Sequence, residues 1–169
     1  MTIQVRPEVL GVLESPLVQI ATAAEAMPGS IKLCYGESDT PTPEFICRAA
    51  AMAQQAGIVA LREGEPYVRE LRARYARCRA LTMEALATLP GVTLPEPQGA
   101  FYAFPRIDGL ADSASFCARL LSETGLAVAP GAAFGPAGEG HVRLCFAATE
   151  ATLGEALRRF RQFMSSRGA

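Results

Sequence analysis

The sequence predicts an α+β fold, in which helices cover mainly one face of a small mixed β-sheet and an N-terminal helical segment comes first. Two observations predict this class. Long stretches carry apolar residues at three- and four-residue spacings, as amphipathic helices do, and short apolar runs bounded by Gly and Pro lie between them. The length of 169 residues suits one domain, residues 1–169, which would bury about 70% of its unfolded surface.

The N-terminal part is expected to be a helix over about residues 7–26 that is interrupted at Pro16. A turn at Pro28-Gly29-Ser30 then leads into a short strand at 31–34. Thr42 followed by Pro43 is a favourable helix start, because a hydroxyl caps the helix and proline is tolerated at its first position. This helix is expected to end at Gly57.

A long helix is expected over about 65–89, with one apolar face. The face consists of Val68, Leu71, Tyr75, Cys78, Leu81, Thr82, Ala85, Leu86 and Leu89. The remaining elements are apolar runs at 92–94 and 100–105, a helix at 113–123, strands at 126–129 and 141–146, and a last helix after Thr149 with the stripe Leu153, Leu157, Phe160 and Met164.

Composition excludes several classes of function. A net charge of -1 gives no field that attracts nucleic acid or an anionic membrane. No apolar run is long enough to span a bilayer, and the first residues do not resemble a signal peptide, so a cytoplasmic protein is expected. The five cysteines are widely spaced and are read as small buried residues, and the single histidine, His141, does not form a zinc motif.

Four segments carry a resemblance to a known family. They are Ile31–Pro43, Gly99–Pro105, Val128–Gly135 and His141–Ala147, in that order along the chain. Together they resemble the small domain of the class I, fold type I, pyridoxal-phosphate aminotransferases of the aspartate and aromatic type. The resemblance covers about 15–56 and 61–165. It implies that residues 1–57 match the family's N-terminal segment, that 61–169 match its C-terminal segment, and that the two are joined at about 57–60 in place of the cofactor-binding large domain.

The resemblance also implies a substrate site. Arg143 matches the arginine that holds the substrate carboxylate, and Gly36 matches a glycine that lies against the substrate. Tyr35, Phe101 and Tyr102 are expected to line the pocket. Without the resemblance, Arg143 would be read as a solvated or ion-paired side chain, Gly36 as a turn glycine, and the aromatic residues as core.

The cofactor machinery of the family is not recognisable. A Schiff-base enzyme requires a lysine nucleophile, and the only lysine here, Lys32, stands in the first strand, where the family often has an ordinary lysine. The run Gly135–Gly140 is read as a turn, because Glu139 would repel a phosphate. No bound pyridoxal phosphate, no other cofactor and no catalytic residue are therefore expected.

Two functional hypotheses follow. The chain is an inactive small-domain remnant that serves as a ligand-binding or interaction module; alternatively, it is part of an aminotransferase acting on amino acids, whose cofactor domain is supplied by another chain. Whether the deletion is natural or engineered stays open, as does a remnant with no selected role. The expected partners are a weakly bound small carboxylate or amino acid and a second copy of the chain. The residues expected at that dimer interface are Val9, Leu10, Val12, Leu13, Leu17, Val18, Ile20, Ile58, Val59 and Leu61.

Overall fold

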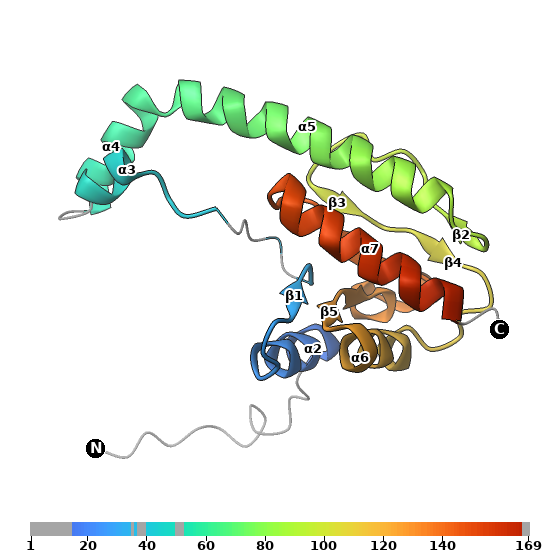
Figure 1. The fold of residues 1–169 in the computed structure, drawn as a ribbon. Coiled ribbons are helices and arrows are strands. Elements are labelled where there is room, and N and C mark those ends of the chain that lie inside the picture. The colour runs from blue at the N-terminus through green and yellow to red at the C-terminus, as the bar shows by residue number, and fades with distance from the viewer. Residues whose placement is uncertain (1–14, 35, 37–39, 50–52, 167–169) are drawn as a thin grey trace, which may run out of the picture.

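The computed structural model describes residues 15–34, 36, 40–49 and 53–166 (Figure 1). The helices are α2 (Pro16–Glu25), α3 (Glu44–Ala49), α4 (Ala53–Glu63), α5 (Glu65–Ala87), α6 (Ser113–Thr124) and α7 (Glu150–Ser166). The strands are β1 (Ile31–Lys32), β2 (Val92–Thr93), β3 (Tyr102–Ala103), β4 (Arg106–Ile107), β5 (Leu126–Ala127), β6 (Ala129–Pro130) and β7 (Val142–Cys145). Two short 3₁₀ turns, η1 (Gly131–Phe134) and η2 (Pro136–Gly138), precede β7.

The strands form three small sheets within the described residues, and not the single mixed sheet that the sequence predicted. Strands β1 and β5 pair in parallel, whereas β2–β4 and β3–β7–β6 are antiparallel. Each strand has only two to four residues, too few to build one continuous ladder. The first and third sheets stay connected through Leu33, whose N–H donates to Ala127 and whose carbonyl oxygen accepts from Cys145.

The core lies where α2, α6 and α7 meet the strands. Helices α2 and α6 both contact β5 and β6, and α7 packs between α6 and α5 (Figure 1). Phe116 of α6 meets Phe163 of α7 edge to face, with ring centroids 5.3 Å apart. Burial of large apolar side chains at this junction supplies the main favourable free energy of folding. The fully buried ones include Leu120, Leu126, Val128, Leu144, Phe146, Leu153 and Phe160.

The predictions near Pro16 and Gly57 have different outcomes. Pro16 begins α2, and Ser15 caps the first turn by accepting from the N–H of Leu17; a helical segment before Pro16 stays a prediction, because residues 7–14 lie outside the described part. The predicted stop at Gly57 is wrong. Helix α4 runs through Gly57, where a stop was expected, and only Gly64 separates it from α5. Gly57 lacks the positive φ of a helix-ending glycine.

The long helix α5 is buried over its C-terminal half alone. Cys78, Thr82 and Leu86 are buried, whereas Val68 is 43% exposed and Leu81 is 38% exposed. The apolar face that the sequence predicts along α5 is therefore only partly covered by the rest of the protein. The hairpin of α3 and α4 lies beyond the N-terminal end of α5, away from the core (Figure 1).

Arg159 joins α7 to two distant segments. Its Nη1 donates to the carbonyl oxygens of Gly29, 3.1 Å away, and Thr124, 3.2 Å away. Glu155 holds the guanidinium from one turn earlier, with 2.8 Å between its Oε1 and Nε of Arg159. Hydrogen bonds from Arg158 and then Arg159 lower the pKa of the Glu155 carboxyl to about 2. Glu155 therefore stabilises the fold as a carboxylate.

This arrangement predicts a specific acid sensitivity. Because the folded-state pKa of Glu155 is depressed, its contribution is fully present above the ordinary value of 4.5 and is lost as the pH falls through about 2. Urea unfolding across this range should show wild type more stable than Glu155→Gln near neutral pH, with the difference shrinking towards pH 2. Glu63→Gln, which removes an exposed carboxylate that has no ion pair in the described part, serves as the control. A difference that is independent of pH would contradict this assignment.

Candidate functional site

The structure brings together the predicted site residues that it describes. Arg143 lies on β7 and Tyr102 on the neighbouring strand β3, where Tyr102 pairs with Cys145. Phe101 precedes β3, and its ring lies 4.8 Å from that of Tyr102. Gly36 follows β1 and reaches the same two rings. Tyr35, the fifth predicted residue, lies outside the described part.

The guanidinium of Arg143 is held between two aromatic rings. Its Cζ lies 4.2 Å from the ring centroid of Tyr102 and 4.3 Å from that of Phe134. Such stacking attracts a cation through the ring quadrupole and fixes the guanidinium plane. Nη2 donates to the carbonyl oxygen of Cys34 at 3.0 Å, while Nε is buried without a hydrogen-bond partner among the described residues. We call Arg143, Tyr102 and Phe134 the arginine clamp.

Phe134 was not among the predicted site residues. It ends η1, and its ring meets Phe104 edge to face at 5.9 Å. The turn holds its shape because Gly131 and Gly138 pack backbone against backbone: a Cβ on either would collide with the other's carbonyl oxygen. The motif Val128–Gly135 already contained Phe134, but nothing in the sequence indicated that its ring would face an arginine.

Gly36 is required for close approach and not for an unusual φ. A Cβ at this position would overlap the hydroxyl of Tyr102 and crowd the ring of Phe101. Gly36 thus lies directly against the ring of Tyr102, which belongs to the clamp. Phe101 also packs against the core. The core reading is therefore confirmed for Phe101, and the role of Phe101 and Tyr102 in lining a pocket stays a prediction.

Lys32 does not have the environment of a Schiff-base lysine. Its side chain is 44% exposed, and its Nζ lies 4.0 Å from a carboxylate oxygen of Glu25. A nucleophilic lysine requires a desolvated or electropositive setting, and Lys32 lies in neither. It is the only lysine of the sequence. The residues present therefore do not fit a covalently bound pyridoxal phosphate.

The Gly135–Gly140 run is a turn, as the sequence predicted, and Glu139 within it has a structural role. Its Oε1 accepts from the N–H of Ser113 at 2.7 Å and from that of Gly140 at 3.1 Å. Asp112 caps the same helix by accepting from Ser115. Two carboxylates thus already occupy the N-terminus of α6, where a phosphate would otherwise bind.

The cysteines differ in their burial. Cys34, Cys78, Cys117 and Cys145 are buried as predicted, but Cys47 is exposed. Desolvation raises the pKa of the Cys117 and Cys145 thiols, which keeps them protonated. In the part of the chain that the structure describes, no group of three metal-binding side chains occurs, and no helix has the length and apolar character to cross a membrane.

Comparison with known proteins relates the fold to one enzyme family. No family model matches the sequence. An aspartate aminotransferase from Pyrococcus horikoshii is 40% identical over 117 residues, which are 68% of this chain and 30% of that protein. An LL-diaminopimelate aminotransferase from Nitratidesulfovibrio vulgaris is 42% identical over 106 residues, covering 63% of this chain and 27% of its own.

Solved structures give the same result. The aromatic aminotransferase from Pyrococcus horikoshii superposes with a TM-score of 0.62 at 38% identity, over 68% of this chain and 31% of that one. The chain therefore spans about 30% of the length of the curated relatives that it matches. Over 68% of its own length, it is homologous to a portion of the class I aminotransferases of the aspartate, aromatic and LL-diaminopimelate types.

Proposed function

We propose that this chain is a carboxylate-binding module derived from an aminotransferase small domain, and that it does not transaminate by itself. The observation that carries the proposal is the arginine clamp. Arg143 is oriented by Tyr102 and Phe134, and it keeps donor capacity that the described residues do not use. A carboxylate is the natural acceptor for two parallel guanidinium donors.

The ligand class follows from the donors. Nη2 already bonds the carbonyl oxygen of Cys34, which fixes one edge of the guanidinium, while Nη1 donates to no described residue. A ligand carboxylate that accepts from this free edge would lie between the two rings. The ligand's apolar part would then contact Phe134, which is 44% exposed. A small 2-oxo or amino acid satisfies both requirements.

Affinity is expected to be low. One charge-assisted bidentate contact contributes about 1.5–3 kcal/mol, which is less than the cost of immobilising a ligand. The remaining contacts are those of two ring faces. We therefore expect a dissociation constant in the millimolar range, which corresponds to a binding free energy of about -4 kcal/mol. The clamp is therefore a receptor for abundant metabolites or one half of a larger site.

Acetate binding should depend on Arg143. Arg143→Ala should abolish the chemical-shift changes that acetate causes in the Tyr102 and Phe134 rings. Arg143→Lys should weaken binding about tenfold, because a point charge replaces a planar pair of donors. Arg106→Ala is the matched control, since Arg106 is an exposed strand arginine that pairs with Asp108. Unchanged acetate binding in Arg143→Ala would refute the proposed site.

A second variant separates the shape of the clamp from its charge. Gly36→Ala forces Tyr102 away from its position, because the new methyl group overlaps the Tyr102 hydroxyl. It should weaken acetate binding while leaving Arg143 in place. Gly57→Ala, where an added Cβ meets no atom within 4 Å, is the control. Equal binding in both alanine variants would show that the rings do not position the guanidinium.

The proposal that the chain alone holds no covalent cofactor is tested at Lys32. The chain is mixed with pyridoxal phosphate, reduced with borohydride and digested for mass spectrometry. An exposed lysine paired with Glu25 should give only substoichiometric labelling that increases with reagent concentration. Saturable labelling of Lys32 at one equivalent, together with turnover of an amino acid, would establish an enzyme instead.

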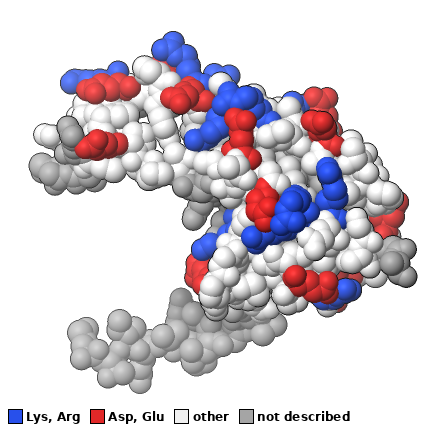
Figure 2. Space-filling view, in the orientation of Figure 1, with Lys and Arg blue, Asp and Glu red and all other residues white. Residues whose placement is uncertain are grey.

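A specific observation favours a partner for the α3–α4 hairpin. Within the described part this hairpin packs chiefly on itself and on the start of α5, and Leu61 is 89% exposed and Ile58 48% exposed. Figure 2 shows a wide hollow between it and the body.

Of the other residues expected at the interface, Val18 is 38% exposed but Ile20 is buried in the core, so the Ile20 prediction was wrong. We propose that a second copy covers this apolar face; a separately encoded cofactor domain is the alternative occupant.

Self-association should be lost when this apolar face becomes charged. Light scattering at micromolar concentration should give twice the chain mass for wild type and the monomer mass for Leu61→Glu, because a buried unpaired carboxylate opposes association. Leu81→Glu changes an exposed leucine at the other end of α5 and should leave the dimer intact. A monomeric wild type that forms a complex with a cofactor-domain protein would favour the alternative.

A further inference from the structure

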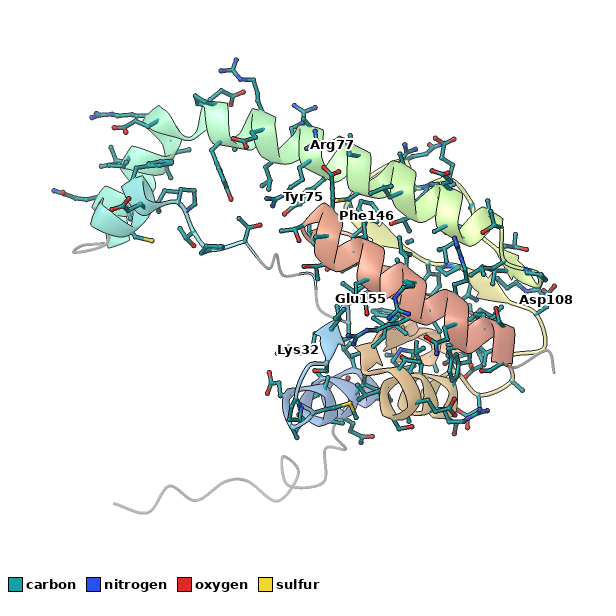
Figure 3. The ribbon with its side chains drawn as sticks, viewed as in Figure 1. Lys32, Tyr75, Arg77, Asp108, Phe146 and Glu155 are labelled. Atoms are coloured by element: carbon teal, nitrogen blue, oxygen red, sulfur yellow. The ribbon has the colours of Figure 1, made fainter. Side chains whose placement is uncertain are left out.

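A cavity that shares no lining residue with the arginine clamp lies beside helix α5. It has a volume of about 540 Å³ and runs between α5 and the loop before β3. We call it the α5 groove, and define it by Arg72, Tyr75 and Arg79 of α5, by Gln98–Ala100 of the loop, and by Phe146. Figure 3 labels Tyr75 and Phe146 on the side of α5 that faces the body. This volume is within the range of small-molecule sites.

Two arginines line the groove from one helix face. Arg72 and Arg79 are seven residues apart, which places them two turns apart on the same side as Tyr75. Arg72 is exposed and has no ion pair or hydrogen bond within the described residues. Between residues 71 and 83, α5 carries four arginines and no acidic residue, and two of these arginines, Arg72 and Arg79, line the groove. The groove therefore lies on the most positively charged stretch of the helix.

Arg79 binds the loop before β3 and also forms an ion pair that a ligand anion could replace. Its Nε donates to the carbonyl oxygen of Pro97 at 2.8 Å, and its Nη2 pairs with Glu96. The Glu96 side chain is 68% exposed. Exposed ion pairs contribute little free energy, so an incoming anion displaces this carboxylate at small cost. The loop remains attached to α5 through Pro97.

The loop supplies further donors. Ala100 has a φ of 56°, the only positive value among the described residues other than glycine. Residues held in this region cost free energy and concentrate at ligand sites. The backbone N–H groups of Gln98, Gly99 and Ala100 donate to no described residue. Successive N–H groups beside a residue in the left-handed region form a concave anion site.

We propose that the α5 groove binds the phosphate group of a small monoester that carries an apolar ring. A phosphate has three strong acceptor oxygens and about -1.5 to -2 charges, which match two guanidinium groups and a run of free N–H groups better than a carboxylate does. Tyr75, which is half-buried, supplies aromatic surface for the ring, and Phe146 forms the floor of the groove beneath it. The ring of Phe101 lies 6.2 Å from that of Tyr75, and neither Arg143 nor Tyr102 nor Phe134 lines the groove. The inference does not depend on the carboxylate site.

The test is a ¹⁵N-edited NMR titration of the full chain with inorganic phosphate and, separately, with phenyl phosphate. Both should shift the amide resonances of Gln98, Gly99 and Ala100, and binding should weaken with added salt. Phenyl phosphate should bind about two- to tenfold more tightly, because only its ring contacts Tyr75. Equal affinity for inorganic phosphate and phenyl phosphate would show that the groove binds phosphate without contacting the ring, and would overturn that part of the proposal. No saturable shifts at millimolar ligand would overturn the whole proposal.

Variants decide which charges act. Arg72→Ala should weaken phenyl phosphate about tenfold or more without releasing the loop, since Arg72 does not hold Pro97. Arg79→Lys keeps the charge and tests the fork geometry, while Glu96→Gln removes the competing carboxylate and should tighten binding. Arg77→Ala is the matched control, because Arg77 pairs with Glu150 outside the groove. Binding that survives Arg72→Ala and Arg79→Lys but is lost in Arg143→Ala would place the phosphate at the clamp and overturn the assignment.

Discussion

The stacking of the Arg143 guanidinium between Tyr102 and Phe134 is the interaction on which the site depends. It joins three segments: strand β3, the turn η1, and strand β7. Nη2 adds a fourth through the carbonyl oxygen of Cys34. Because a guanidinium stays charged at any ordinary pH, the clamp persists across the range in which the fold is stable. Gly36 packs against the side chains of Tyr102 and Phe101.

The position of the site follows from short-range constraints. Strand β7 lies between β3 and β6, so Arg143 and Tyr102 are presented by neighbouring strands. The contact between Gly131 and Gly138 sets the turn that carries Phe134. A small change in the contact between Gly131 and Gly138 would move the ring of Phe134 and would leave the Arg143 guanidinium on its strand. The clamp therefore separates orientation, which the rings control, from attraction, which the arginine supplies.

Sequence predicted the elements well and their assembly less well. Helices α5, α6 and α7 lie where apolar periodicity placed them, because that periodicity reports the face a helix buries. The failures are at Gly57, where α4 continues although glycine often ends a helix, and in the sheets, where pairing of two-residue strands depends on contacts far away in sequence. Phe134 and the α5 groove were missed for the same reason, since both exist only through tertiary contacts.

The central claim is that the arginine clamp receives a carboxylate. A crystal structure of the chain grown with 3-phenylpropionate tests it most directly, because the ligand has a carboxylate for Arg143 and a ring for Phe134. The account predicts both carboxylate oxygens within hydrogen-bond distance of the Arg143 guanidinium, with the Cys34 contact retained. A ligand bound elsewhere, with Arg143 unchanged between its two rings, would contradict it.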